Sequence, residues 1–191
     1  MGSLKGTKTE KNILTAFAGE SQARNRYTYF AKQAKKEGYE QMAAIFEETA
    51  NHEKAHAKRL FRLLEGGEVE VTASFPAGVI GTTLENLKAS AAGEHFENTE
   101  MYPEFARIAK EEGLVEIAVV FECIGRAEKY HENRYLGLAK SIEEDSVFKR
   151  PAKVSWVCRN CGMVHEGFEA PAVCPACNHP RAHFSMLTEQ W

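Results

Sequence analysis

The sequence contains one pattern twice, as AKKEGYEQMAAIFEETANHEKAH at residues 34–56 and as AKEEGLVEIAVVFECIGRAEKYH at residues 109–131. The two copies align without a gap at an offset of 75 residues, and apolar residues recur in both at helical spacing. A shorter repeat lies upstream, because AGE at 18–20 returns at 92–94, one residue out of step. Repetition of this kind indicates that one supersecondary unit occurs twice.

Each copy has the features of a helical hairpin. A Thr followed three residues later by Glu opens the first helix at Thr7 and at Thr82, in the pattern of a capping box. Gly38 and Gly113 follow Lys- and Glu-rich stretches and can supply the turn between the two helices. Pro103 removes a backbone donor and is expected to bend or interrupt the third helix. The expected helices cover 8–37, 39–65, 83–112 and 114–143.

The segment 66–81 between the two hairpins is too long for a tight turn. It begins with two glycines and contains Pro76, so we expect it to cross from the second helix to the third. The predicted architecture is therefore a four-helix bundle with one long crossover.

Composition and charge exclude several classes of protein. The 191 residues are 43% hydrophobic and 27% charged, and the net charge of −3 gives no basic footprint for nucleic acid. No apolar run approaches the roughly 18 residues that span a bilayer. The N-terminus also lacks the apolar region of a secretory signal. We therefore expect a cytoplasmic protein with neither nucleic acid nor a membrane among its partners.

Five glutamates lie on or beside the apolar stripes of the expected helices, where neighbours three and four positions away are apolar. Solvated positions do not fit these neighbours, and an unpaired buried carboxylate is costly. Arg24 and Arg126 can balance one or two of the charges, which leaves a structural polar cluster as the alternative to metal. Two divalent cations balance the whole set, and carboxylates with one imidazole per cation favour iron or manganese. The glutamates are Glu20, Glu53, Glu94, Glu97 and Glu128.

Residues 52–56, HEKAH, match the zinc-protease pattern in which two histidines bind zinc and the Glu between them activates water. The second copy has Ala127 in place of His52 and keeps the rest, so the repeated unit is E-x-x-H. The repeat therefore makes Glu53 and Glu128 metal ligands rather than catalytic bases. His52 is left at the edge of the stripe, with support of the metal ligands as its alternative role, and a protease is the minor alternative for the chain.

The ligand pattern is that of the ferritin-like di-iron proteins, in which two helices each give one Glu and two others each give Glu-x-x-His. Glu97 lies one helical turn beyond Glu94 and adds a carboxylate to this pattern. The single glutamates are Glu20 and Glu94, and the pairs are Glu53–His56 and Glu128–His131.

The chain changes character after the charged stretch 143–153. Four of the five cysteines form two C-x-x-C pairs, which predicts a tetrahedral four-thiolate metal site rather than disulfides. Such a site takes zinc or one iron. Zinc ribbons are common, whereas a dinuclear oxidising site in the same chain needs an electron source, which favours iron. The ligands are Cys158, Cys161, Cys174 and Cys177.

The cysteine region and the remaining cysteine of the chain, Cys123, have expected structural roles. Short strands are expected at 154–157 and 163–166. Cys123, in the fourth helix, is expected to be a small core residue rather than a nucleophile. Apolar cover for the metal is expected from Trp156, Val157, Val164, Phe168 and Phe184, whereas His165, His179 and His183 are expected on the surface because four cysteines complete the coordination.

Over its whole length the sequence resembles the rubrerythrins, in which a ferritin-like di-iron bundle is joined to a rubredoxin-like domain. The E-x-x-H pairs carry one half of the resemblance, and CRNCG and CPAC, which are similar to the knuckles of rubredoxin, carry the other. Asn178 stands where rubredoxins usually have Gly, and Asn tolerates the left-handed backbone better than most residues. The resemblance implies a mainly α fold, with a ferritin-like bundle at 1–145, a linker at 146–153 and a small β-rich rubredoxin-like domain at 154–191 that binds iron through four cysteines.

The resemblance also implies a function in oxidative-stress defence, as a non-haem di-iron peroxidase that reduces hydrogen peroxide to water. Three irons per chain are implied, with electrons passing from an external donor (a reductase or small redox protein) through the iron of the four cysteines. A homodimer or higher homo-oligomer is implied as well. The main alternative is a ferroxidase or iron-handling protein that uses oxygen, and a zinc ribbon on a metal-loaded scaffold is a non-catalytic alternative.

The family pattern gives each residue of the bundle site a role in this sequence. By the resemblance, Glu53 and Glu128 bridge the two irons, while Glu20 and Glu94 are terminal ligands, one on each iron. His131 binds one of the irons.

Four further residues are candidates for a part in the reaction. The resemblance implies that Glu97 and His56 exchange on the second iron as its oxidation state changes. Tyr27 and Tyr102 would donate hydrogen bonds to the ligands, and plain core aromatics are the alternative reading of these two.

Overall fold

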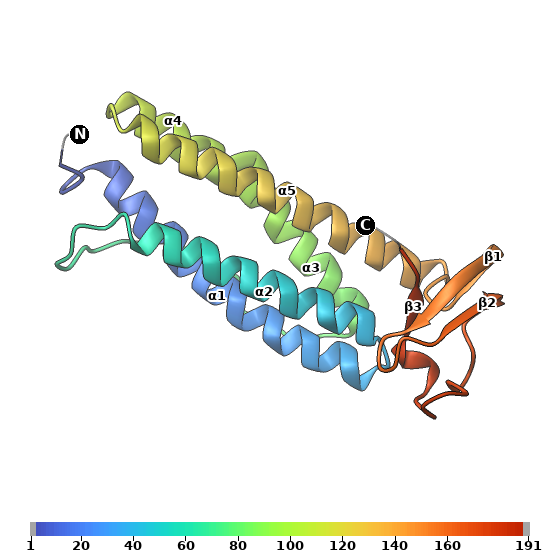
Figure 1. Ribbon diagram of the computed structural model, residues 1–191. Coiled ribbons are helices and arrows are strands. Elements are labelled where there is room, and N and C mark those ends of the chain that lie inside the picture. Colours follow the sequence, from blue (N-terminus) through green and yellow to red (C-terminus); the bar gives the residue numbers. More distant parts are fainter. Residues whose placement is uncertain (1–2, 189–191) are drawn as a thin grey trace.

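The computed structural model describes residues 3–188, and its helices form an antiparallel four-helix bundle (Figure 1). The first hairpin packs α1 against α2, and the second packs α3 and α4 against α5. The bundle and its crossover were predicted correctly. The helices are α1 (Lys8–Lys36), α2 (Glu40–Phe61), α3 (Thr83–Phe96), the π-helix η1 (Glu97–Met101), α4 (Tyr102–Glu111) and α5 (Val115–Glu143).

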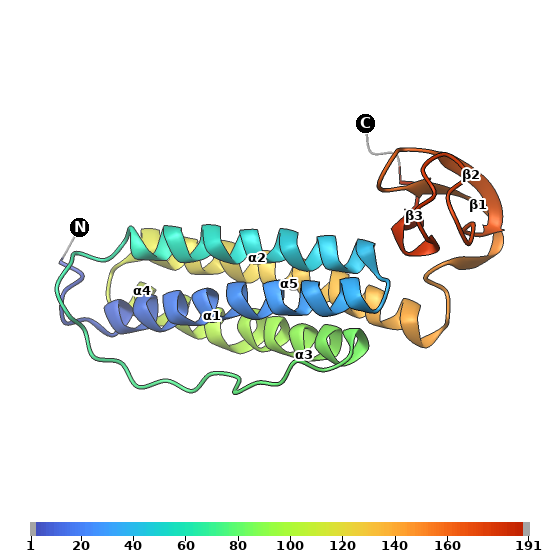
Figure 2. The same ribbon diagram turned by 90° about the horizontal axis from the view of Figure 1, so that it is seen from below.

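The chain between α2 and α3 runs along the outside of the bundle from one end to the other (Figure 2). It is anchored at Pro76, whose carbonyl oxygen accepts a hydrogen bond of 2.7 Å from the side-chain amide of Gln22. This crossover allows both hairpins to lie antiparallel in one bundle, with their inner faces turned toward each other.

Glycines close both hairpins, as the sequence predicts. Gly38 and Gly113 have φ values of +83° and +74°, which a residue with a Cβ adopts only with strain. Each ends its helix in the same motif, in which the Gly amide and the next amide donate to carbonyls of the preceding turn. The bonds are Gly38 to Lys35 at 3.1 Å and Tyr39 to Ala34 at 2.9 Å, and Gly113 to Lys110 at 3.0 Å and Leu114 to Ala109 at 2.8 Å.

Only one of the two expected capping boxes is complete. At Thr82 the side chain accepts from the amide of Glu85, and the Glu85 carboxylate accepts from the Thr82 amide. At Thr7 the hydroxyl accepts from the Glu10 amide, but the Glu10 carboxylate accepts from the Gly6 amide instead. The second copy therefore has the reciprocal cap and the first has half of it.

The third helix is interrupted, although not at Pro103 itself. The amide of Tyr102 donates to the carbonyl of Glu97, five residues earlier, so the turn from Glu97 to Met101 is a π-helix. Pro103 lies in the first turn of α4, directly after the π-helix. The extra residue of the π-helix lies between the upstream repeat, whose offset is 74, and the downstream repeat, whose offset is 75.

Polar side chains of the π-helix donate hydrogen bonds to backbone carbonyl groups of the turn that precedes it. The side-chain Nδ2 of Asn98 donates to the Glu94 carbonyl at 2.8 Å and to the carboxylate of Glu132 at 2.8 Å. Thr99 donates to the His95 carbonyl at 2.7 Å. Asn98 and Glu132 thus tie the π-helix to α5.

The C-terminal part is a three-stranded antiparallel sheet in the order β2-β1-β3. Trp156 and Phe184 are buried with Cys158 and Cys174, as expected. The expectation for Val164 and Phe168 is wrong, because both are about half exposed, at 49% and 52%. The elements are β1 (Lys149–Cys158), β2 (Val164–Glu169), the 3-10 helix η2 (Arg181–His183) and β3 (Phe184–Met186).

The sheet packs at the end of the bundle where α1 turns into α2 (Figure 2). The rings of Tyr39 and Phe148 stack with their centroids 6.2 Å apart. β1 begins at Lys149, so residues 149–153 are strand, although they were expected in the linker. The division of the chain into domains at 145 and 154 stays a proposal.

We expect Gly113→Ala to lower the free energy of unfolding of the bundle by about 1 kcal/mol, because the helix end requires φ near +74° there. Gly137→Ala is the matched control, since Gly137 lies inside α5 with nothing within 4 Å of an added Cβ. It should stabilise the bundle by about 0.5–1 kcal/mol. Urea unfolding followed by helical circular dichroism measures both, and equal effects of the two substitutions would contradict the argument.

Candidate metal centres

Two groups of potential metal ligands lie side by side in the middle of the bundle. One contains Glu20, Glu53, His56 and Glu128, and the other contains Glu53, Glu94, Glu128 and His131. Within each group, one ligand atom from every residue lies within 4.8 Å of the others. Glu53 and Glu128 belong to both groups, so the arrangement suits two cations that share two carboxylates.

Each helix hairpin contributes half of this centre. Glu20 comes from α1 and the E-x-x-H pair of the first copy from α2, while Glu94 comes from α3 and the second pair from α5. The four glutamates and His131 are at most 2% exposed, and the side chain of His56 is 17% exposed. The apolar stripes that flank these residues therefore carry them into the core, as predicted.

Arg24 and Arg126 do not balance the negative charge of the buried glutamates. No ion pair joins Arg24 or Arg126 to these glutamates among residues 3–188. Arg126 instead donates to Cys123 at 3.2 Å on the surface. Cys123 is exposed, so its prediction as a core residue is wrong. It lies on the outer face of α5, between the positions that form the stripe.

Several ligand atoms are buried without hydrogen bonds in the described part of the chain. They are one oxygen of Glu53, one of Glu94, both of Glu128, and Nδ1 of His131. Native cores rarely leave such atoms unsatisfied, because each costs about 1–3 kcal/mol or more when charged. Nδ1 of His131 lies 2.7 Å from Glu128 and 3.3 Å from Glu53. Nδ1 of His56 lies 3.0 Å from Glu128 and 3.1 Å from Glu53. These oxygen and nitrogen donors fit a pair of metal ions.

Ionisation in the metal-free centre follows from burial and proximity. Burial, then the neighbouring carboxylates, raise the pKa of Glu20 well above its ordinary value and that of Glu94 to about 8. For Glu53 burial acts in the same direction, but the imidazoles of His131 and His56 beside it outweigh burial and lower the pKa to about 2. Burial lowers the pKa of His131, and its carboxylate partners outweigh this and raise it to about 12. Without metal, protons thus balance the charge that cations would balance.

Two tyrosines each reach a glutamate of the other copy. The hydroxyl of Tyr27, on α1, donates to Glu94 on α3 at 2.5 Å. The hydroxyl of Tyr102, on α4, donates to Glu20 on α1. Both rings are fully buried in the apolar core, so each residue packs as a core aromatic and also meets the carboxylate.

Glu97 lies outside both ligand groups, while His56 lies inside one. The Glu97 side chain is half-buried in the π-helix and lines a pocket of 570 Å³ beside α1. Burial, then Glu20 and Glu94, raise its pKa well above the ordinary value. The exchange of Glu97 with His56 stays a prediction.

Two further residues lie beside the ligands. His52, for which the sequence left open a place at the edge of the stripe or a part in supporting the ligands, has its Nδ1 3.1 Å from Nε2 of His131, and its ring stacks on that imidazole. The role of Glu132 was not foreseen. It accepts from His95 at 2.9 Å, from Lys129 at 2.9 Å and from Asn98, and of these partners Asn98 belongs to the π-helix.

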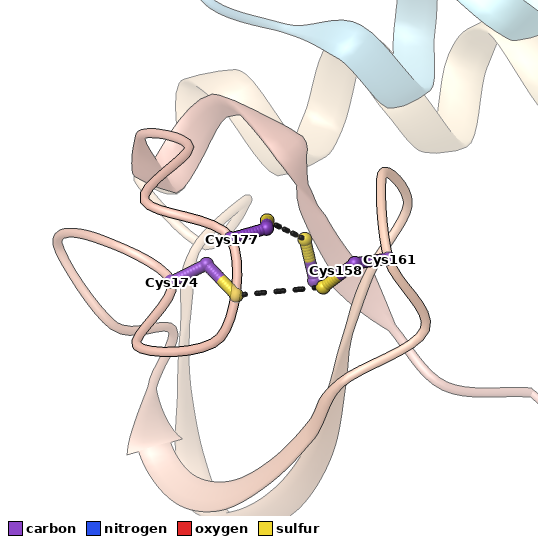
Figure 3. Close-up of side chains that lie close together, drawn as sticks. All are labelled: Cys158, Cys161, Cys174 and Cys177. Carbon is purple, nitrogen blue, oxygen red and sulfur yellow. Dashed lines mark hydrogen bonds between the residues drawn. The ribbon is translucent and has the colours of Figure 1, made fainter.

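The four cysteines face one another from two loops of the small sheet region (Figure 3). The sulfur atoms of Cys158 and Cys177, and those of Cys161 and Cys174, are 3.7 Å apart. Four thiolates around one metal at about 2.3 Å would place their sulfurs about 3.8 Å apart, so the site fits a tetrahedral ion. The three histidines of this region lie outside the group.

Both cysteine loops close in the same way. The backbone amide of Gly162 donates to the carbonyl oxygen of Cys158 at 2.8 Å, and the backbone amide of Asn178 donates to the carbonyl oxygen of Cys174 at 2.9 Å. Their φ values are +77° and +60°. The left-handed conformation expected for Asn178 is therefore confirmed.

No helix in the described part of the chain is long and apolar enough to span a membrane.

Comparisons with known proteins agree with both sites. The rubrerythrin family matches residues 11–139, and the rubredoxin-like domain of rubrerythrins matches residues 156–185. The chain is 63% identical to a rubrerythrin of Nitratidesulfovibrio vulgaris over 191 residues, which is the whole of both chains. A mixed-valent nigerythrin structure aligns with a TM-score of 0.63 at 33% identity, over 97% of this chain and 92% of that one. A bacterioferritin of Mycobacterium tuberculosis, 20% identical, has a TM-score of 0.63 over 75% of this chain and 89% of its own, and shares the bundle fold.

We expect the metal-free protein to lose stability as the pH rises from about 5 to about 8. Glu94, with a pKa of about 8, keeps a proton in the folded state that the unfolded chain releases near pH 4.5. Above about pH 6.5 His131 acts in the same direction, because its folded pKa is about 12. Each such proton changes the free energy of unfolding by up to about 1.4 kcal/mol per pH unit.

Urea unfolding of chelator-treated protein at these two pH values measures this dependence. The metal-loaded protein should not show the loss, because ligation keeps the carboxylates deprotonated. Glu94→Gln should flatten the dependence of the metal-free form. A urea midpoint of unfolding that rises with pH in the metal-free protein would contradict the raised pKa values given to Glu94 and His131.

Proposed function

The chain belongs to the rubrerythrin family, and on that premise we propose that it is a non-haem di-iron peroxidase that reduces hydrogen peroxide to water. Its place would be in oxidative-stress defence, with electrons arriving through an iron bound by the four cysteines. One observation carries the proposal: two buried ligand groups share Glu53 and Glu128, in the same chain as a four-thiolate group. The reaction needs two electrons, and the cysteine site offers a way to replace them one at a time.

We propose that three irons bind per chain. Glu53 and Glu128 would be shared between the two irons of the bundle, and this pair would supply the two electrons that the reduction of peroxide needs. Glu20 with His56, and Glu94 with His131, would complete the two positions, in agreement with the division of ligands between the two groups.

The chain's own residues would orient these ligands. Tyr27 and Tyr102 each donate a hydrogen bond to the terminal glutamate of the opposite hairpin, which fixes the rotation of that carboxylate. His52 contacts the far nitrogen of His131, which leaves Nδ1 turned toward the centre. We propose that Glu97 replaces His56 when the centre is oxidised, because the π-helix brings its carboxylate beside Glu20 and Glu94.

The electron donor would be an external reductase or small redox protein, and we propose a homodimer or higher homo-oligomer as the working form in the cytoplasm. A ferroxidase that uses oxygen would need the same bundle ligands. A ferroxidase takes its electrons from its iron substrate and does not need a four-thiolate group to reduce the centre. The presence of that group therefore favours the peroxidase.

Anaerobic stopped-flow absorbance of the fully reduced protein tests the proposal. Mixing with hydrogen peroxide should return the ferric colour fast, whereas mixing with oxygen should return it slowly. Faster reaction with oxygen would favour the ferroxidase. A protein without colour under either oxidant would have zinc at the cysteines, and the electron-transfer part of the proposal would fall.

We expect Cys158→Ser to abolish steady-state turnover with an external reductant and to spare a single turnover of prereduced protein. Cys158 belongs to the four-thiolate group and to none of the bundle groups, so the substitution separates electron delivery from peroxide reduction. Cys123→Ser is the matched control, because Cys123 is an exposed cysteine outside the site. Loss of the single turnover in Cys158→Ser, with normal iron in the bundle, would count against this division of roles.

We expect Glu97→Ala to keep most of the bundle iron and to slow reoxidation by peroxide about 10- to 100-fold, the scale for loss of one positioned group. Iron analysis and the stopped-flow rate give the two readouts. Glu100→Ala is the control, because Glu100 is an exposed residue of the same π-helix that also lines the pocket. An unchanged rate in Glu97→Ala would remove Glu97 from the reaction.

A further inference from the structure

A pocket of 570 Å³ lies between α1, the π-helix with α4, and the crossover, which runs along this side of the bundle (Figure 2). Its lining is largely apolar, with Phe75 from the crossover and Phe96, Met101 and Phe105 from the opposite wall. Glu97 lies on the same wall. The wall of the pocket therefore includes a residue that belongs to the proposed reaction.

The size of the pocket exceeds what hydrogen peroxide needs. A peroxide molecule is about as large as two waters, or about 60 Å³. The pocket has the size of a site for a small organic molecule, for which about 300–1,000 Å³ is usual. Its aromatic and thioether lining would gain nothing from contact with a small polar substrate but would favour an apolar one.

Two glycines on facing helices keep the pocket wide. Gly19 and Gly93 are the glycines of the repeated AGE, and each directly precedes a terminal glutamate of the metal centre. Glycine inside a helix lowers its stability relative to alanine. Packing does not explain either one, because a Cβ would meet Phe75 at 3.6 Å from Gly19 and Arg26 at 4.0 Å from Gly93, which are ordinary contacts.

We propose that this pocket receives the organic group of neutral hydroperoxides, so that alkyl and aryl hydroperoxides are substrates beside hydrogen peroxide. The inference rests on the proposed peroxidase function and names a substrate class for the same centre. The O–O bond would break with two electrons from the reduced centre and two protons. One proton would go to each oxygen, giving the alcohol and water, and the external donor would restore the electrons.

The apolar lining of the pocket, rather than its charges, favours neutral substrates over anionic ones. Glu97, Glu100 and Glu104 line it, with Arg26 as the one basic residue among the described lining. Glu104 is paired with Arg107 at 2.6 Å, so the charged groups give the pocket little net charge and its apolar lining decides which substrate fits.

Steady-state kcat/KM for cumene hydroperoxide and for hydrogen peroxide, measured on the iron-loaded full chain, tests the inference. For the wild type the two values should lie within about tenfold of each other. Gly19→Met should lower the ratio of cumene hydroperoxide to hydrogen peroxide about tenfold, because the new side chain fills the apolar space. Phe75→Ala, on the crossover and away from the ligands, should lower the same ratio and serves if Gly19→Met does not fold or load iron. Gly137→Ala is the control with an unchanged ratio.

A binding measurement separates the pocket from catalysis. The alcohol product, 2-phenylpropan-2-ol, should bind the oxidised full chain in a calorimetric titration and should bind Gly19→Met at least about tenfold more weakly. A wild-type ratio below about one-tenth, or a ratio unchanged in Gly19→Met, with hydrogen peroxide still reduced, would overturn the inference and leave the peroxidase proposal standing. Failure with both substrates would overturn the peroxidase proposal and this inference together.

Discussion

Four carboxylates cannot remain charged in one apolar core unless cations balance them, and the rest of the bundle depends on this constraint. The helices bring Glu20, Glu53, Glu94 and Glu128 to one place, and no arginine or lysine of the described chain joins them there. In the metal-free state protons and two histidines carry the compensation. The folded bundle therefore favours the binding of divalent metal. Each cation displaces protons from the carboxyl groups and coordinates oxygens that otherwise lack hydrogen-bond partners.

Neither hairpin can make this centre alone. Each supplies one Glu, one E-x-x-H pair and one tyrosine, and each tyrosine reaches the glutamate of the other hairpin. Assembly of the core and assembly of the site are thus the same event, which is a consequence of the internal repeat. The cysteine site differs, because both of its loops belong to one small sheet region and close by the same local turn.

The sequence was informative where spacing is local. Residues three apart share a helix face, and cysteines three apart form a knuckle, so the ligand groups of both sites could be predicted from the sequence alone. Prediction failed where tertiary contacts decide exposure. Cys123 is on the surface although its neighbour Ile124 is buried, and Val164 and Phe168 face outward from a sheet with only one covered side. The role of Glu132 was not predicted because its partner Asn98 lies in the π-helix. No residue type in the sequence indicates a π-helix, so the contact between Asn98 and Glu132 could not be predicted.

The π-helix has a consequence for the history of the chain. One residue more than an α-helix needs lies between Glu94 and Tyr102, and this surplus accounts for the change in repeat offset from 74 to 75. Substitutions cannot produce such a shift, whereas the insertion of a single codon into one of two duplicated halves can. A symmetric ancestor would then have had equivalent first helices, and one inserted residue in the second half would have brought a new carboxylate, Glu97, to the edge of a finished metal centre.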